Sequence, residues 1–405
     1  MKSYTSETDV SFVQTKILGL LDFCKGLAIA WVFLFHCYRG GWFGWQGVHI
    51  FIVLSGFGLT YSCLQKRDNF SWKQWYIKRF EKVLPTYWVV CLFGFLIMLC
   101  HYIFTNEDVA KNLLKAAIKL KLDILVFSKL SHQTIFALPN SALWFIPLIL
   151  GYYLVFPWLY TRTLKDETTK GYLSILLGVV ALEFIYRGIT IYWLDGFPIG
   201  YENRFDALSL EPIKPLNRLI DSWIMPFQLQ APFGLFPSRI GEFMLGMIGA
   251  ILLAKNPQKF TNIFLDCRIG LTGVFIWLAG YCLVYVGLWG WIFADFIISL
   301  GLVLWVVNLA WIFQQRWGFL FITLSKLGIW SYYIFLTHDI FVYVYWETLP
   351  AIGLDIDSLS WSTNNIVRLG FIMFCTWTTS CLLLKFDKSR LPHLIIKNSL
   401  ARAVK

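Results

Sequence analysis

The sequence predicts an all-α, polytopic membrane protein with about ten transmembrane helices. Of its 405 residues, 58% are hydrophobic and only 15% are charged, whereas about 25% are charged in soluble globular proteins. Apolar runs of about 20 residues recur along the chain, which is the length that an α-helix needs to cross a bilayer. The 20 Trp and 19 Tyr residues suit the aromatic belts of membrane interfaces.

The apolar runs locate the expected spans, and the basic residues between them indicate orientation. Six of the 17 residues in 66–82 are Lys or Arg, which is typical of a cytoplasmic loop. We expect a transmembrane domain at 17–384, between cytoplasmic tails at 1–16 and 385–405, in the plasma (inner) membrane. The spans are expected at about 17–38, 46–65, 83–104, 142–160, 171–194, 238–254, 269–288, 290–313, 319–346 and 366–384.

Two stretches between the expected spans are long. Lys111, Lys115 and Lys119 recur every four residues among apolar side chains. This pattern predicts an amphipathic helix that lies on the membrane rather than crossing it. The segment 195–237, rich in Pro, acidic and aromatic residues, is long enough to form a lid or an acceptor-binding wall.

Charge and cysteine usage argue against several other classes of protein. The formal net charge is +11, but no soluble basic domain is present to bind nucleic acid, and a bias of the cytoplasmic loops accounts for the charge better. The nine cysteines show no Cys-x-x-Cys or Cys/His ligand spacing. We therefore expect no metal site and no disulfide framework, with the thiols acting as small buried hydrophobic groups.

The first expected span carries three ionisable residues. On a helix, Lys25 and His36 lie about 20° apart around the axis, and Asp22 lies about 40° from His36. An ionised group at the bilayer centre costs about 2.5 kcal/mol or more, so this stripe is expected to face a protein interior or a water-filled cavity. The alternative is structural: an Asp22–Lys25 ion pair and a hydrogen-bonded histidine.

Several stretches together carry a family likeness. The first ends at His36 and has the basic Lys25 eleven positions earlier, with ten residues between them; the second ends in Ser55-Gly56-Phe57. In this order along the chain, they resemble the acyltransferase-3 family of integral membrane acyltransferases over about residues 20–390. The matching stretches are Leu21–His36, Gly47–Phe57, Tyr76–Pro85, Asn140–Pro157, Arg239–Gly246 and Ser331–His338.

The chain departs from the family pattern at three positions. Lys25 stands where arginine is usual, His49 where aspartate is common, and Lys82 where the last basic residue is usually arginine. Lysine keeps the positive charge but loses the bidentate fork of arginine. These changes affect how an acyl donor would be held, and they raise the question of whether a second histidine joins the site.

The resemblance implies a membrane acyltransferase that uses acyl-CoA, usually acetyl-CoA, as a co-substrate, with no permanently bound cofactor. The implied acceptor is a hydroxyl or amine of a cell-surface glycan or a lipid-linked precursor. Acyl transfer needs a base, and His36 is the candidate because an imidazole titrates near neutral pH. Lys25 and Asp22 complete the predicted catalytic group.

Other residues receive supporting roles in this interpretation. Lys78, Arg79 and Lys82 are candidates for the donor phosphates, with positive-inside anchoring as the alternative. Arg239 and Glu242 either contact the donor or lock helices as an ion pair, while Glu183 and Arg187, four residues apart, are expected to form a structural pair. Asp339 is expected to orient His338. The further cavity candidates are His49, Ser55, Asn140, Trp144, Tyr332 and His338.

Two other functions remain open from the sequence. A carrier or flippase would line a translocation route with the polar stripe and form no covalent bond. Many such transporters have inverted repeats or paired broken helices, and neither is evident here. A non-catalytic scaffold of a glycan-assembly complex is the third reading.

Overall fold

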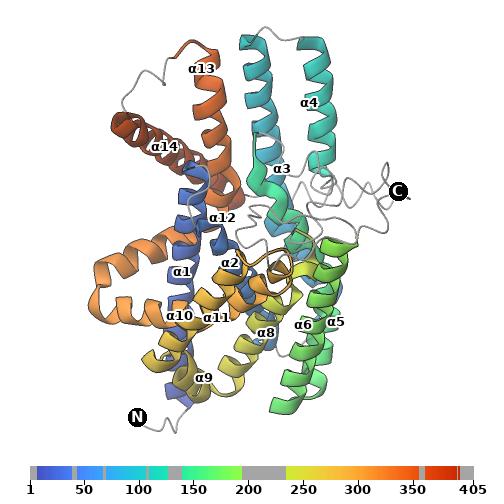
Figure 1. Ribbon diagram of the computed structural model, residues 1–405, viewed down its shortest axis with the longest axis vertical. Coiled ribbons are helices and arrows are strands. Elements are labelled where there is room, and N and C mark those ends of the chain that lie inside the picture. The colour runs from blue at the N-terminus through green and yellow to red at the C-terminus, as the bar shows by residue number, and fades with distance from the viewer. Residues whose placement is uncertain are drawn as a thin grey trace. The chain divides into compact units, whose positions relative to one another are not determined.

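The computed structural model describes residues 7–38, 43–66, 70–105, 109–125, 139–193, 234–354, 361–389 and 391–392. Within these residues the secondary structure consists of helices and turns, without a strand (Figure 1). Nine of the described helical segments are long and apolar enough to cross a membrane, or ten if one bent pair counts as a single span. The predicted all-α, polytopic fold is therefore confirmed.

The described helices have the following bounds in chain order. They are α1 (Glu7–Cys37), η1 (Gly44–Gln46), α2 (Gly47–Leu64), α3 (Trp72–Phe104), α4 (Val109–Ile124), η3 (Ser141–Trp144), α5 (Phe145–Lys165), α6 (Thr169–Tyr192), η6 (Phe236–Arg239), α8 (Ile240–Lys255), α9 (Pro257–Phe264), α10 (Cys267–Leu283), α11 (Gly290–Arg316), α12 (Gly318–Tyr343), the π-helical turn η7 (Val344–Thr348), α13 (Leu349–Ala351) and α14 (Trp361–Asp387).

The structure corrects the prediction at two boundaries. The basic stretch 66–82 is not a loop throughout, because α3 already begins at Trp72; the Lys, Gln, Arg and Glu residues that follow Trp72 are good helix formers. The span expected at 269–288 is instead the bent pair of α9 and α10, whose axes differ by 60°. The predicted lid or wall at 195–237 lies almost entirely outside the described residues, as do residues 1–6 and most of the second tail. Residues 7–16 of the expected first tail are helical and belong to α1.

The chain divides into two compact units. The first unit contains Met1–Val32, Gly44–Phe70 and Leu148–Ile329, and the second contains Phe33–Phe43, Ser71–Pro147 and Trp330–Lys405. Helices α1, α5 and α12 each contribute residues to both units. Each unit has its own hydrophobic core and is described separately below.

Glycines set the helix packing of the first unit. A Cβ atom on Gly246 of α8 would lie 1.9 Å from the Val53 carbonyl oxygen, and one on Gly56 of α2 would lie 2.1 Å from the Phe243 carbonyl oxygen. The backbones of α2 and α8 therefore touch, as small residues permit in membrane helices. The other extensive helix pair of this unit is α10 with α11.

The α1 backbone near Lys25 is also in close contact with neighbouring helices. A Cβ atom on Gly26 would lie 1.8 Å from the Leu324 carbonyl oxygen, and one on Gly328 would lie 1.8 Å from the Asp22 carbonyl oxygen. On another side of α1, a Cβ atom on Gly47 would lie 2.3 Å from the Ala28 carbonyl oxygen. The small residues after Lys25 thus allow α12 and the start of α2 to contact the α1 backbone directly.

In the second unit, α3 and α4 lie side by side (Figure 1). The Tyr87 hydroxyl donates to the Asp123 carbonyl oxygen at 2.8 Å, and the Trp88 indole donates to the Ile124 carbonyl oxygen at 3.0 Å. The lysine-rich segment is therefore helical, as predicted. These two bonds join the end of α4 to the middle of α3, so the two helices run antiparallel. The position of α4 on the membrane surface stays a prediction.

The α2–α8 contact yields a stability prediction. Gly246→Ala places a methyl group against backbone, so the helices must separate and unfolding should become easier by about 1–3 kcal/mol. Gly58→Ala is the matched control, because a Cβ atom at Gly58 meets nothing within 4 Å and alanine favours the helix by about 1 kcal/mol. Denaturant unfolding in detergent measures both variants, and equal stability of the two would contradict the proposed backbone contact.

Candidate functional site

His36 and His338 form a hydrogen-bonded pair in the second unit. His36 is half-buried near the end of α1, and His338 is fully buried on α12. The His338 Nε2 and His36 Nδ1 atoms are 3.0 Å apart, with ring centroids separated by 4.9 Å. The structure thus brings together the predicted base and one of the predicted cavity residues, although 302 residues separate them in the sequence.

The partners of His338 determine where the protons lie. Its Nδ1 atom is 2.9 Å from the Ile334 carbonyl oxygen and 3.0 Å from that of Phe335. Carbonyl oxygens only accept hydrogen bonds, so Nδ1 of His338 carries the proton and its Nε2 accepts when the ring is neutral. His36 must then donate from Nδ1. A neutral His36 therefore carries its lone pair on Nε2, which is the atom that a general base needs.

The turn before α5 is fastened to the same part of α12. Asp339 accepts from the Ser141 backbone N–H at 2.5 Å, from the Ser141 hydroxyl at 2.7 Å and from the Ala142 N–H at 3.2 Å. The Asn140 amide donates to the Leu336 carbonyl oxygen at 2.7 Å. Asp339 therefore caps the start of η3. The orientation of His338 by Asp339 stays a prediction.

Three other predicted cavity residues make local contacts. The Tyr332 hydroxyl donates to the Val83 carbonyl oxygen of α3 at 2.9 Å, which links α12 to the helix that carries Lys82. The half-buried Trp144 ring meets Phe145 edge-on, with centroids 6.1 Å apart. Ser55 donates to the Phe51 carbonyl oxygen of its own helix at 2.7 Å. A role in a cavity stays a prediction for all three.

The predicted donor-binding cations lie in the first three turns of α3. Lys78 and Lys82 are exposed, and Arg79 is half-buried with its guanidinium 5.6 Å from the Trp75 ring centroid. Since residues four apart share a helix face, Lys78 and Lys82 project on the same side. This arrangement leaves ammonium groups accessible to a charged ligand, although anchoring at the interface has the same geometry.

Asp22 and Lys25 pair with each other in the first unit. The Lys25 Nζ and Asp22 Oδ1 atoms are 2.9 Å apart, and their side chains are 39% and 36% exposed. This contact is the structural ion pair that the sequence left open as an alternative. A catalytic role for either residue stays a prediction.

A fully buried polar cluster occupies the centre of the first unit. It combines two guanidinium groups, three carboxyl groups, one imidazole and one hydroxyl, drawn from α2, α6, η6, α8 and α11. Buried charges require partners, because the surrounding helices offer no water. The members are Arg187, Arg239, Glu183, Glu242, Asp295, His49 and Ser299.

Asp295 of α11 connects the two arginines of this cluster. Its Oδ2 atom is 2.7 Å from Arg187 Nη1 and 3.1 Å from Arg239 Nη2. Arg187 also donates from Nε to the Trp291 carbonyl oxygen at 2.8 Å. The expected pair of Glu183 with Arg187 is therefore wrong. Glu183 instead accepts from the Gly241 N–H at 2.7 Å, so each residue ties α6 to a different helix.

His49 and Glu242 meet on the other side of the cluster. The His49 Nδ1 atom is 3.0 Å from Glu242 Oε2, 3.2 Å from Arg239 Nη1 and 3.1 Å from the Ser299 hydroxyl. The Arg239 Nη1 and Glu242 Oε1 atoms are 3.8 Å apart, and both side chains are buried. Of their two predicted roles, the geometry fits helix locking, and contact with a donor is not supported.

The sequence analysis missed Asp295 and Ser299. Asp295 is an acidic residue inside the apolar run Gly290–Arg316, and an intramembrane acid is itself a signal of a buried partner. Ser299 follows four residues later, which places both side chains on one face of α11. The acid within the apolar run therefore indicated a buried partner. The partners themselves could not be identified, because they lie more than 50 residues away in the sequence.

The described parts of the chain contain no arrangement of side chains suited to a metal ion. There, no group of three or more His, Cys, Asp or Glu side chains is arranged to hold a metal ion. All nine cysteines are free, and four of them are buried.

Comparison with known proteins identifies one related family. A family model described as an acyltransferase domain, that of acyltransferase family 3, matches residues 19–385. No curated protein and no solved structure gives a match.

The buried cluster predicts a sharp difference between two aspartates. Asp295→Asn removes the carboxylate that both arginines share and should destabilise the protein by about 3 kcal/mol or more, because buried cations lose their partner. Asp22→Asn is the matched control and should cost less than about 1 kcal/mol, since its ion pair is solvent-accessible. Unfolding in detergent gives both values; similar losses would show that the cluster does not hold the first unit together.

Proposed function

As a member of the acyltransferase-3 family, shown by the match over residues 19–385, the protein is a membrane acyltransferase, and we propose that His36 is its general base. The observation that supports this role is the pairing of His36 Nδ1 with His338 Nε2 at 3.0 Å. With both rings neutral, that contact leaves the His36 lone pair on Nε2. His338 acts as a positioning residue, since it reaches the acceptor only through His36.

The proposed reaction transfers the acyl group of a cytosolic acyl-CoA, usually acetyl-CoA, to a hydroxyl of a cell-surface glycan or related acceptor. His36 Nε2 removes the hydroxyl proton while the oxygen attacks the thioester carbonyl carbon. The carbon–sulfur bond then breaks, and the proton passes to the departing thiolate. The resulting imidazolium keeps its Nδ1–H bond to His338, so positive charge develops on a ring that already has an acceptor.

The basic start of α3 is the proposed binding site for the donor phosphates. Lys78 and Lys82 are exposed on one face, with Arg79 beside them. Phosphate oxygens form strong charge-assisted hydrogen bonds with such groups. In this proposal α3 presents them at the cytoplasmic face, where acyl-CoA is available.

Substitution of the two histidines tests the base and its positioning partner. His36→Ala should lower kcat by about 10²–10⁴, the usual contribution of a general base, with normal folding. His338→Leu should lower kcat at unchanged KM, whereas His338→Gln should recover part of the rate because its amide oxygen can accept from His36. The assay follows labelled acetyl groups from acetyl-CoA into surface glycans; full activity of His36→Ala would remove His36 from the mechanism.

Charge removal on α3 tests the donor site. Lys78→Gln with Lys82→Gln should raise KM for acyl-CoA by about tenfold or more, since each charged hydrogen bond contributes about 1.5–3 kcal/mol. Lys73→Gln is the matched control: Lys73 is also exposed on α3, but it lies about 140–180° around the helix from the other two. If Lys73→Gln raised KM equally, general anchoring would explain the charges.

The assay with labelled acetyl-CoA also distinguishes an acyltransferase from a carrier. Membranes that contain the protein should transfer label from acetyl-CoA to an acceptor, whereas a carrier would leave the acceptor unlabelled. The retained fold of His36→Ala is checked by its elution and unfolding in detergent, so loss of label in that variant reports on chemistry.

A further inference from the structure

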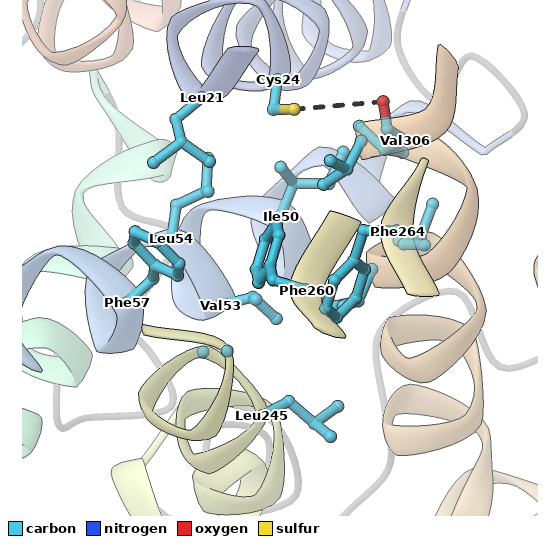
Figure 2. Close-up of a pocket in the computed structure, with 15 residues that line it drawn as sticks. Leu21, Cys24, Ile50, Val53, Leu54, Phe57, Leu245, Phe260, Phe264 and Val306 are labelled. Carbon is cyan, nitrogen blue, oxygen red and sulfur yellow. Dashed lines mark hydrogen bonds between the residues drawn. The ribbon is translucent and has the colours of Figure 1, made fainter. Parts of the chain in front are cut away.

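A half-open apolar pocket lies within the first unit, apart from the polar cluster. It contains about 520 Å³ of empty space, including its opening. Figure 2 shows side chains of α2, α8 and α9 directed toward this common space. Its lining includes Cys24, Leu54, Phe57, Gly249, Phe260 and Phe264, together with residues of the 302–307 segment of α11.

The lining has almost no hydrogen-bonding capacity. No charged, amide or hydroxyl side chain contributes to it. The one heteroatom in its side chains is the Cys24 sulfur, which lies 4.0 Å from the Val306 carbonyl oxygen (Figure 2). A polar ligand would lose its hydration here without gaining partners, and purely apolar cavities do not hold water. The group that fits is therefore a hydrocarbon.

Gly249 keeps the pocket open without being needed for helix contact. A Cβ atom at Gly246 would strike backbone at 1.9 Å, but at Gly249 it would meet only the Phe57 ring, at 3.6 Å. A glycine inside a helix costs about 1 kcal/mol relative to alanine. Alanine would fit at this position, so close packing does not require the glycine, and its effect is to preserve space.

Helix α9 gives the pocket an amphipathic edge. Phe260 and Phe264 are buried and line the pocket, whereas Lys259 and Asn262 of the same helix are exposed. Such a short helix, bent by 60° from α10, is typical of a segment at the headgroup level of a membrane. Arg268, the second residue of α10, is exposed as well, with the exposed Asp266 two positions before it. Lys259 and Arg268 therefore leave a net positive charge beside the apolar lining.

We propose that this pocket binds one acyl chain of an anionic phospholipid, whose headgroup lies against the basic residues around α9. The hydrocarbon lining accommodates the chain, and Lys259 and Arg268 provide charges complementary to a phosphate. The occupant comes from the bilayer that the surrounding helices cross. None of the residues that line the pocket is a proposed catalytic residue, and the proposal does not depend on the proposed function.

Photolabelling of the full-length protein in bilayers tests the proposal. The probe is phosphatidylglycerol with a diazirine on one acyl chain, at low content in phosphatidylcholine vesicles, with labelled peptides located by mass spectrometry. Labelling is expected on the peptides that contain 257–264 and 302–307. Gly249→Leu should reduce it by about tenfold, the factor for about two methylene groups that lose their burial.

Control variants separate this result from nonspecific effects. Gly58→Leu adds the same side chain where the structure leaves open space and should label like the wild type. Leu54→Trp fills the pocket from another helix, so the test survives if Gly249→Leu does not fold. Lys259→Gln should weaken labelling by phosphatidylglycerol but not by the matching phosphatidylcholine probe. Equal labelling of wild type and both filled variants, or label spread evenly over all spans, would overturn the proposal.

Discussion

A polar side chain buried among membrane-spanning helices is shielded from water, so its hydrogen-bond partners come from neighbouring helices or from its own backbone. This constraint shapes both units. In the first, Asp295 holds Arg187 and Arg239 at 2.7 and 3.1 Å, which joins α6, η6 and α11. In the second, His338 and Asp339 connect α12 to α1 and to the turn before α5. Glycine contacts bring the helices close, and these polar contacts determine their register.

Most of the fold could be predicted from the sequence, because the hydropathy and length of a membrane-spanning helix are local properties of the chain. The spans from Gly44–Leu64 to Thr363–Asp387 follow runs of apolar residues that any bilayer would select. The start of α3 at Trp72 could not be predicted from the basic residues, because the positive-inside rule indicates the side of the membrane and not the backbone conformation. The placement of α4 along α3 depends on the Tyr87 and Trp88 bonds, which no periodicity encodes.

The sequence predicted many residues of the candidate site and pairs within one helix, but not the pairs between helices. His36 and His338 were both singled out, yet their contact joins positions 302 residues apart. Glu183 and Arg187 have the i, i+4 spacing of a helical ion pair. Arg187 instead pairs with Asp295 of α11, and Glu183 accepts from the Gly241 backbone N–H. A single sequence specifies which side chains need partners, whereas the tertiary fold decides which partners they receive.

The neighbouring positions of His338 and Asp339 have a consequence for modularity. Consecutive helical residues point about 100° apart, so one binds the imidazole of α1 while the other binds the turn at Ser141. A one-residue insertion between them would rotate one contact away from its partner. Helix α12 and the 140–142 turn therefore form a single structural unit, and a chimera between related transferases would have to exchange both together.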